Sequence, residues 1–236
     1  MIAVARLYIL PVTQRISEAI VAEGLGYISE EKRARLHRFR HRDDLLRGLW
    51  ADLLLRSRII EDLHMSNADI RFELNAYGKP RLSGADNYHF NVSHAGEWVV
   101  CMVDSEPVGV DVEHVKAMDI TMARSFFAEE EYRYVMESAQ SKEQMQRFYH
   151  IWTAKESYIK AVGKGLSLPL QEFSVLTAEG VEGAKKLGGE AWQLQSYDLH
   201  TEDYKLTACF KPTMEIHEVE RVNVNRILAT LRSVNH

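Results

Sequence analysis

Residues 98–113 have the sequence WVVCMVDSEPVGVDVE, in which the β-rich runs 98–104 and 108–113 are separated by Ser105-Glu106-Pro107. Runs rich in valine favour strands, and a short polar connection with proline is typical of a turn. The pattern therefore predicts a β-hairpin. The same connection divides the chain, and we place a boundary there between an N-terminal half, residues 1–105, and a C-terminal half, residues 106–236.

Strands and helices follow one another in a similar order on both sides of this stretch, which predicts an α+β fold with two related halves. Apolar residues at helical spacing mark the helices, and alternating or β-branched runs mark the strands. The expected elements are an N-terminal strand, one long basic helix or two joined near His41 from Ser29 to about Ile60, a strand at 70–74, helices from about Met118 to Val162, and strands at 172–176, 192–197 and 204–210.

The composition excludes several classes of protein. Of the 236 residues, 46% are hydrophobic and 27% are charged, as is typical of a folded globular chain. No run approaches the roughly 18 apolar residues of a membrane helix, so we expect no membrane partner. The net charge of −5 argues against a general nucleic-acid binder. Cys101 and Cys209 lie among apolar residues, as expected for reduced thiols in a cytoplasmic protein.

One segment is strongly basic although the chain as a whole has a negative net charge. Residues 32–47 contain seven Lys or Arg and only two acidic residues. Such a local excess is typical either of a solvated helix face or of a site for a phosphate-rich ligand.

Asp111 and Glu113 alternate with valines, so their side chains share one face of the predicted strand, with Cα atoms about 7 Å apart. On a partly buried face, two carboxylates raise each other's pKa unless a cation lies between them. Oxygen ligands of this kind suit Mg²⁺, which takes one or two carboxylates together with substrate phosphates. The alternative is the polar outer face of an edge strand.

Residues 148–162, FYHIWTAKESYIKAV, have the apolar spacing of a helix. Lys155 projects into the apolar stripe, where an ammonium must reach solvent or meet an anion. Glu156 and Lys160 lie on the edge of the stripe at i, i+4 spacing, which an ordinary surface salt bridge also shows.

Two shorter motifs have ordinary explanations when each is taken alone: Ser93 and His94 in NVSH, and Lys79 in the turn sequence YGKP. Taken in order, however, NVSH (91–94), GVDVE (109–113) and WTAKESYIK (152–160) resemble the successive motifs of the surfactin-synthetase-activating type of 4′-phosphopantetheinyl transferase. The resemblance covers about residues 28–176, including YGKP and the GKGLSLPL stretch after the helix.

This resemblance implies two pseudo-twofold-related α/β halves, each with a small, mainly antiparallel sheet packed on helices, and an active site in the cleft between them. The N-terminal half would bind the adenosine and phosphate end of coenzyme A, and the C-terminal half would hold Mg²⁺ and the catalytic carboxylates. The implied reaction transfers 4′-phosphopantetheine to a serine of an apo acyl or peptidyl carrier protein and releases adenosine 3′,5′-bisphosphate. A monomer would suffice.

The resemblance also implies the site residues. The metal ligands would be Asp111, Glu113 and Glu156, and the catalytic residues Glu156 as the base, Lys160 and His94, with Glu113 as an alternative base. Lys155, Lys160 and His94 would contact the coenzyme near its phosphates, and Lys32, Arg35, Arg47, Lys79, Pro80 and Ser93 would hold the 3′-phosphoadenosine end. Two positions depart from the family pattern: Arg35 replaces what can be a lysine, and Gly48 stands where some relatives have a hydroxyl.

Three other functions fit parts of the pattern. An RNA- or nucleotide-binding module would use the basic segment and would not need Asp111 or Glu113. A Mg²⁺-dependent hydrolase of nucleotide pyrophosphates would release products without a carrier. An inactive relative would act only as a binding scaffold. The natural carrier and the tolerance for acylated coenzyme A are not determined by the sequence.

Overall fold

The computed structural model describes residues 5–13, 15–178, 180–213 and 216–233. They form two compact units of mixed α/β structure. Unit 1 contains the described residues of Met1–Glu73, Arg81–Ser105 and Ile216–His236, and unit 2 contains those of Leu74–Pro80 and Glu106–Glu215. Each unit has its own four-stranded sheet and its own apolar core.

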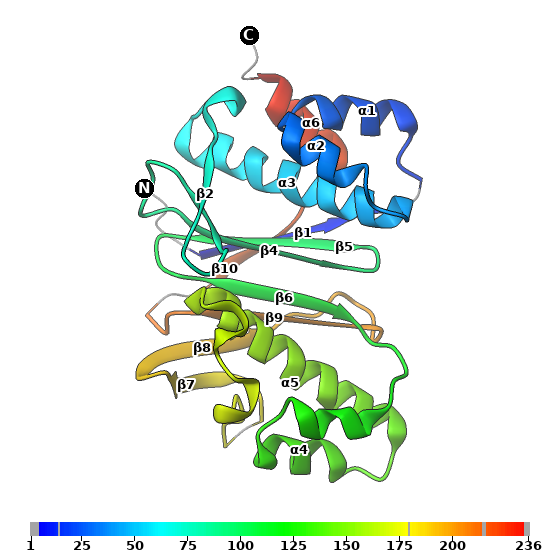
Figure 1. Cartoon of the computed structure of the whole chain (residues 1–236), viewed down its shortest axis with the longest axis vertical. Coiled ribbons are helices and arrows are strands. Elements are labelled where there is room, and N and C mark those ends of the chain that lie inside the picture. The colour runs from blue at the N-terminus through cyan, green and yellow to red at the C-terminus, as the bar shows by residue number, and fades with distance from the viewer. Residues whose placement is uncertain (1–4, 14, 179, 214–215, 234–236) are drawn as a thin grey trace. The chain divides into compact units, whose positions relative to one another are not determined.

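The sheet of unit 1 has the strand order β10-β1-β5-β4. Its strands are β1 (Ala5–Pro11), β4 (His89–Ala95), β5 (Trp98–Asp104) and β10 (Ile216–Arg221). β10 runs parallel to β1, and the other pairings are antiparallel. The helices α1 (Glu18–Gly26), α2 (Glu30–Leu36), α3 (Arg42–Leu63) and α6 (Val224–Ser233) lie together on one side of this sheet (Figure 1). The short strands β2 (Phe72–Leu74) and β3 (Pro80–Leu82) form a two-stranded ribbon after η1 (Asn67–Asp69).

The predicted basic helix is present as two helices, which confirms the second of the two sequence-based alternatives. Ser29 caps α2, because its hydroxyl accepts a hydrogen bond from the backbone N–H of Lys32 at 3.2 Å. The helix ends at Leu36, and α3 begins at Arg42. The buried side of α3, which includes Trp50 and Leu53, packs into the core of unit 1.

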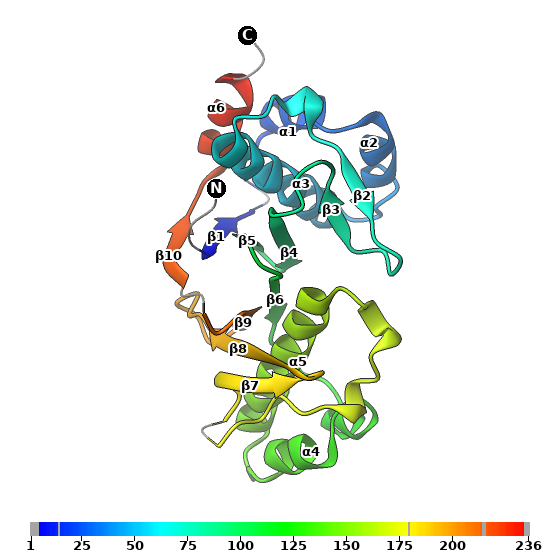
Figure 2. The ribbon, with the colours of Figure 1, turned by 90° about the vertical axis from the view of Figure 1, so that its left-hand side faces the viewer.

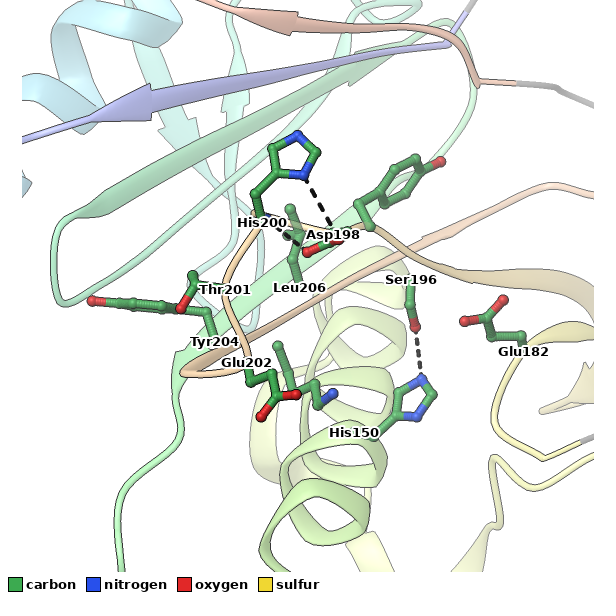
Figure 3. Close-up of a pocket in the computed structure, with 11 residues that line it drawn as sticks. His150, Glu182, Ser196, Asp198, His200, Thr201, Glu202, Tyr204 and Leu206 are labelled. Atoms are coloured by element: carbon green, nitrogen blue, oxygen red, sulfur yellow. Dashed lines mark hydrogen bonds and ion pairs between the residues drawn. The ribbon is translucent and has the colours of Figure 1, made fainter. Parts of the chain in front are cut away.

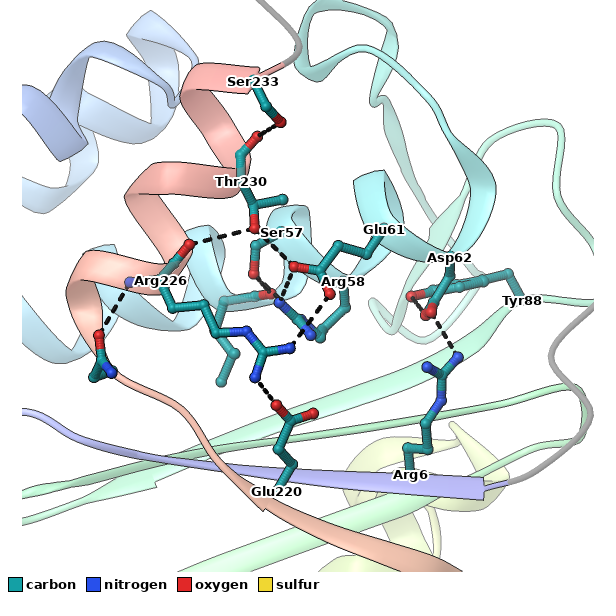
Figure 4. Close-up of polar contacts among 12 residues, drawn as sticks. Arg6, Ser57, Arg58, Glu61, Asp62, Tyr88, Glu220, Arg226, Thr230 and Ser233 are labelled. Carbon is teal, nitrogen blue, oxygen red and sulfur yellow. Dashed lines mark hydrogen bonds and ion pairs between the residues drawn. The ribbon is translucent and has the colours of Figure 1, made fainter.

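A polar network around the buried Arg58 joins α3 to α6 and β1 (Figure 4). The Arg58 guanidinium is 1% exposed, lies 4.7 Å from the centre of the Tyr8 ring and donates to Glu61 at 2.8 Å. The hydroxyl of Thr230 in α6 donates to the same Glu61 carboxylate at 2.7 Å. Because a buried guanidinium is costly without partners, these contacts fix the C-terminal helix on α3.

The sheet of unit 2 is antiparallel and has the strand order β6-β9-β8-β7. Its strands are β6 (Gly109–His114), β7 (Gly183–Leu187), β8 (Glu190–Ser196) and β9 (Tyr204–Phe210). Its helices are η2 (Ile120–Ser125), α4 (Glu129–Met136), α5 (Ser141–Val162), η3 (Gly165–Ser167) and η4 (Leu170–Glu172). α5 lies against β6 and β9, and α4 packs on α5 (Figure 2).

Three sequence-based expectations differ from the structure. The hairpin predicted for residues 98–113 is wrong, because β5 pairs with β1 and β4 whereas β6 pairs with β9 in the other sheet. The strand predicted at 172–176 is absent from the described structure, which instead contains the unpredicted strand β7. The C-terminal half was expected to include residues 106–236, but β10 and α6 return to unit 1 and residues 74–80 belong to unit 2.

One further expectation is met within the described residues. Cys101 and Cys209 are buried free thiols, as predicted from their apolar neighbours. None of the described helices is both long enough and apolar enough to cross a membrane.

Candidate functional site

The two carboxylates of β6 lie on the face that α5 covers. Gly109 shares this face with Asp111 and Glu113, and a methyl group on Gly109 would lie 1.9 Å from the backbone oxygen of Ser157. The strand and the helix therefore meet backbone to backbone, which only glycine permits at that position. Asp111 is 3% exposed. This burial excludes the alternative of a polar outer face.

α5 adds a carboxylate and an ammonium to these groups. Lys160 donates from Nζ to Asp111 Oδ1 at 2.5 Å and to the Val110 carbonyl at 3.4 Å. Glu156, one helical turn earlier, interacts electrostatically with both Asp111 and Lys160. The two predicted motifs are thus brought together within unit 2. We call Asp111, Glu113, Glu156 and Lys160 the acidic cluster.

The pKa values of Glu113 and Glu156 follow from burial and like charge. Burial and the neighbouring Asp111 raise the pKa of Glu113 to about 7, while Lys160 and a hydrogen bond from Trp152 oppose the rise and Glu156 adds to it. Burial and Asp111 likewise raise the pKa of Glu156, and Lys160 again opposes this. Three carboxylates repel one another in this partly buried site, and a bound cation would offset that repulsion.

The chemistry of this donor set fits Mg²⁺, which prefers carboxylate oxygens. Among the residues that the structure describes, however, no three His, Cys, Asp or Glu side chains are arranged to hold a metal ion. The ammonium of Lys160 instead supplies the positive charge next to Asp111. The ligand set Asp111, Glu113 and Glu156 therefore stays a prediction.

Lys155 does not reach the acidic cluster, which corrects the prediction that it contacts coenzyme phosphates. Its side chain is completely buried and paired at 2.8 Å with Glu131 of α4, which is completely buried too. Its Nζ also donates to the carbonyls of Leu170 at 2.7 Å and Phe173 at 2.5 Å. These three acceptors use all the donors of an ammonium. The anion that the sequence analysis required for Lys155 is thus a side chain of the protein.

Glu131 was missed by the sequence analysis, although its position contained a signal. It lies four residues after Phe127 and four before Val135, both buried, so it occupies the apolar stripe of α4. Glu131 also accepts backbone hydrogen bonds from Val175 at 2.8 Å and Ala128 at 2.9 Å. The N–H of Val175 thus bonds to Glu131, and the carbonyl of Phe173 bonds to Lys155. Both backbone groups belong to residues 172–176, the segment that was predicted as a strand.

Lys79 of the YGKP turn lies in unit 2, at the end of α5. Its Nζ donates to the carbonyls of Ala161 at 3.1 Å and Val108 at 3.2 Å. Burial lowers the pKa of Lys79 to about 8. Pro80, the next residue, begins β3 and is exposed.

The remaining predicted residues lie in unit 1. In β4, Ser93 is buried and His94 is exposed. Arg47 of α3 donates to the carbonyl of Gly96, just after β4, at 2.8 Å, and is paired with Asp44 at 2.5 Å. Lys32 of α2 lies 3.6 Å from Asp52 of α3, and Arg35 is exposed. Their roles toward coenzyme A stay predictions.

A pocket of about 800 Å³ lies elsewhere in unit 2, beside α5 and the connection from β8 to β9 (Figure 3). His150 Nε2 and Ser196 Oγ are 2.6 Å apart in its wall. Burial, with a smaller effect of Lys205, lowers the pKa of His150 to about 4, so the imidazole is neutral at pH 7. No residue of the acidic cluster lines this pocket.

Comparisons with known proteins agree over most of the chain. Residues 107–209 match the model of the 4′-phosphopantetheinyl transferase superfamily, and residues 17–106 match that of the 4′-phosphopantetheinyl transferase N-terminal family. Similar proteins include 4′-phosphopantetheinyl transferase ffp of Bacillus subtilis, 46% identical over 151 residues (64% of this chain, 67% of that protein). Another Bacillus subtilis 4′-phosphopantetheinyl transferase is 40% identical over 187 residues (78% and 83%). 4′-Phosphopantetheinyl transferase psf-1 of Bacillus pumilus is 34% identical over 210 residues (88% and 89%).

Proposed function

Because the chain belongs to the 4′-phosphopantetheinyl transferase superfamily, we propose that it transfers the 4′-phosphopantetheine of coenzyme A to a serine of an apo acyl or peptidyl carrier protein. The observation that carries this proposal is the acidic cluster. It combines two carboxylates of β6 with a carboxylate and an ammonium of α5, in the order and spacing of the motifs.

The reaction is a phosphoryl transfer at the pyrophosphate of coenzyme A. The serine oxygen forms a bond to the phosphorus that bears the pantetheine arm, and the bond from that phosphorus to the bridging oxygen breaks. Adenosine 3′,5′-bisphosphate leaves with the electron pair, and the serine proton passes to a base. Catalysis of such a step rests on positioning and on neutralising the developing negative charge.

We propose that Asp111, Glu113 and Glu156 hold Mg²⁺, which when bound would supply positive charge to the pyrophosphate. This accounts for Glu113 and Glu156, whose pKa values burial and the charge of Asp111 raise. It also follows the preference of Mg²⁺ for a few carboxylates together with substrate phosphates.

The side chains of α5 perform the remaining steps in this proposal. Glu156 accepts the proton of the carrier serine, and its raised pKa brings it closer to neutral pH, where a general base is most effective. Lys160, 27% exposed, turns its ammonium from Asp111 toward a phosphate oxygen and stabilises the charge on the leaving group. Glu113 is the alternative base.

The test is transfer to a carrier. The protein is incubated with coenzyme A, MgCl₂ and an apo carrier domain, and the intact mass of the carrier is measured. We expect the mass to increase by one phosphopantetheine group, and we expect no increase with EDTA or with a carrier whose acceptor serine is alanine. No increase with any of several carriers would contradict the proposal, and release of adenosine 3′,5′-bisphosphate without a carrier would indicate the hydrolase.

A further inference from the structure

The YGKP turn forms a compact loop that is braced by one side chain. Asn75 Oδ1 accepts hydrogen bonds from the backbone N–H groups of Tyr77 and Lys79, each at 2.9 Å. The backbone N–H of Asn75 donates to the Lys79 carbonyl, also at 2.9 Å. Gly78 at the tip has φ +85°, which favours glycine. The turn therefore holds Asn75 and Lys79 in fixed positions on the same loop.

From this loop, both side chains reach the end of α5. Asn75 Nδ2 donates to the carbonyl of Gly163 at 2.9 Å, and Lys79 Nζ donates to that of Ala161 at 3.1 Å. The last four carbonyls of a helix lack partners within the helix, and a buried helix end needs partners from elsewhere. The loop supplies two of them, so it caps the C-terminus of α5.

Lys79 also bonds the residue that leads into β6. The same Nζ donates to the carbonyl of Val108 at 3.2 Å, directly before Gly109, where β6 meets the backbone of α5. One amine thus bridges the helix that supplies Glu156 and Lys160 and the strand that supplies Asp111. An amine has two N–H donors even when neutral, so both bonds persist through its titration near pH 8.

We infer that Asn75 and Lys79 are positioning residues for the transfer reaction, which hold α5 in register with β6 so that Lys160 meets Asp111. This inference rests on the proposed function. It gives Lys79 a different role from the direct coenzyme contact that the resemblance implies. If Lys79 contacts coenzyme A directly, its removal lowers the affinity for coenzyme A. If Lys79 holds α5 in register with β6, its removal lowers kcat instead.

The experiment separates these roles. Lys79→Met removes both bridging bonds, and Asn75→Asp keeps the acceptor that braces the loop but removes the donor to Gly163. For each variant, kcat and KM for coenzyme A are measured with a carrier, and the Kd for coenzyme A is measured by calorimetry. Arg81→Met is the control, since Arg81 is 62% exposed on the neighbouring strand and pairs with the exposed Glu73 and Asp86.

We expect kcat to fall roughly 10- to 100-fold in both variants, because a displacement of about 1 Å at a catalytic group costs this much, with Kd within about threefold of the wild type. A Kd that rises at least tenfold while kcat is unchanged would overturn the inference in favour of a coenzyme contact. Wild-type kinetics in both variants would also overturn it. If Lys79→Met does not fold, Asn75→Asp decides. An inactive wild type with every carrier would reject the proposed function instead.

Discussion

The Nζ of Lys160 in α5 lies 2.5 Å from Oδ1 of Asp111 in β6. This ion pair joins the helix and the strand that supply the other carboxylates of the acidic cluster. Asp111 is the more deeply buried partner, with a side chain 5% exposed against 27% for Lys160. Lys160 is therefore the partner that solvent reaches, whereas Asp111 is enclosed by the protein.

Replacing Lys160 by Ala is expected to lower kcat by about 10²- to 10³-fold, since it removes the donor aimed at the developing charge. The same change leaves Asp111 without its ammonium. The measurement is steady-state transfer to a carrier. Lys142→Ala is the matched control in the same helix, because Lys142 is exposed and pairs with Glu202 at the surface. Equal losses in the two variants would contradict a specific role for Lys160.

Replacing Glu156 by Gln tests the assignment of the base. If Glu156 accepts the serine proton, kcat falls by roughly 10²- to 10⁴-fold while coenzyme A still binds. Glu113→Gln, measured in parallel, should retain more activity. Calorimetry reports binding, and a single-turnover assay reports chemistry. The opposite order of activities would assign the base to Glu113, and full activity of the Glu156 variant would remove that residue from the mechanism.

Breaking the pair between Lys155 and Glu131 should destabilise unit 2 without a specific effect on the coenzyme. Lys155→Met leaves a carboxylate buried without its cation, which typically costs about 3–5 kcal/mol. The double variant with Glu131→Gln should recover part of that loss. Urea unfolding gives the free energies, and calorimetry gives the Kd for coenzyme A. A folded Lys155→Met protein with wild-type stability and weakened coenzyme binding would restore the original assignment.

Gly109→Ala is expected to cost more than about 3 kcal/mol of unfolding free energy, because the new methyl meets a backbone oxygen that cannot move aside. The same substitution at Gly26, the last residue of α1, is the control, since a methyl there meets no atom within 4 Å. Gly26→Ala should be neutral or stabilising by about 0.5 kcal/mol. Comparable stability of the two variants by urea unfolding would show that β6 and α5 do not meet closely at Gly109.

The partly buried His150 predicts a dependence of stability on pH. Its pKa is about 4 in the folded protein and near 6.5 when unfolded. Between about pH 7 and pH 4, the imidazole of His150 becomes protonated in the unfolded chain but stays neutral in the folded protein. The free energy of unfolding therefore decreases progressively as the pH falls through this range. The loss is on the order of 1–3 kcal/mol.

Unfolding free energies at pH 7.5 and pH 5 measure this effect. The difference between the two pH values should be smaller in His150→Gln than in the wild type. His37→Gln, a change at an exposed histidine, should leave the difference unchanged. An identical pH dependence in the wild type and His150→Gln would contradict the prediction.

Much of the site was predictable because its signals are local. The alternation around Asp111 and the i, i+4 spacing of Glu156 and Lys160 place these side chains on defined faces of a strand and a helix. The order of the motifs along the chain indicated the family. The start of a helix near Ser29 was likewise readable from a short stretch, whereas the division of the basic segment into α2 and α3 was one of two open alternatives.

Partner choice was not predictable in the same way. Residues 98–104 and 108–113 have the pattern of a hairpin, yet each run pairs in a different sheet. The segment 172–176 has strand-like residues, but two of its backbone groups form hydrogen bonds with the side chains of Glu131 and Lys155 rather than with another strand. A pattern gives the propensity to pair but not the partner, because several distant segments compete for the same hydrogen bonds.

The sequence by itself determined the family, the elements that carry the carboxylates and the need of Lys155 for an anion. Only the tertiary structure decided that this anion is Glu131, that Lys79 bonds the carbonyls of Ala161 and Val108, and that Lys160 pairs with Asp111. The physical reason is that a buried charge must find its partner in three dimensions, whereas periodicity along the chain fixes only the face from which it starts.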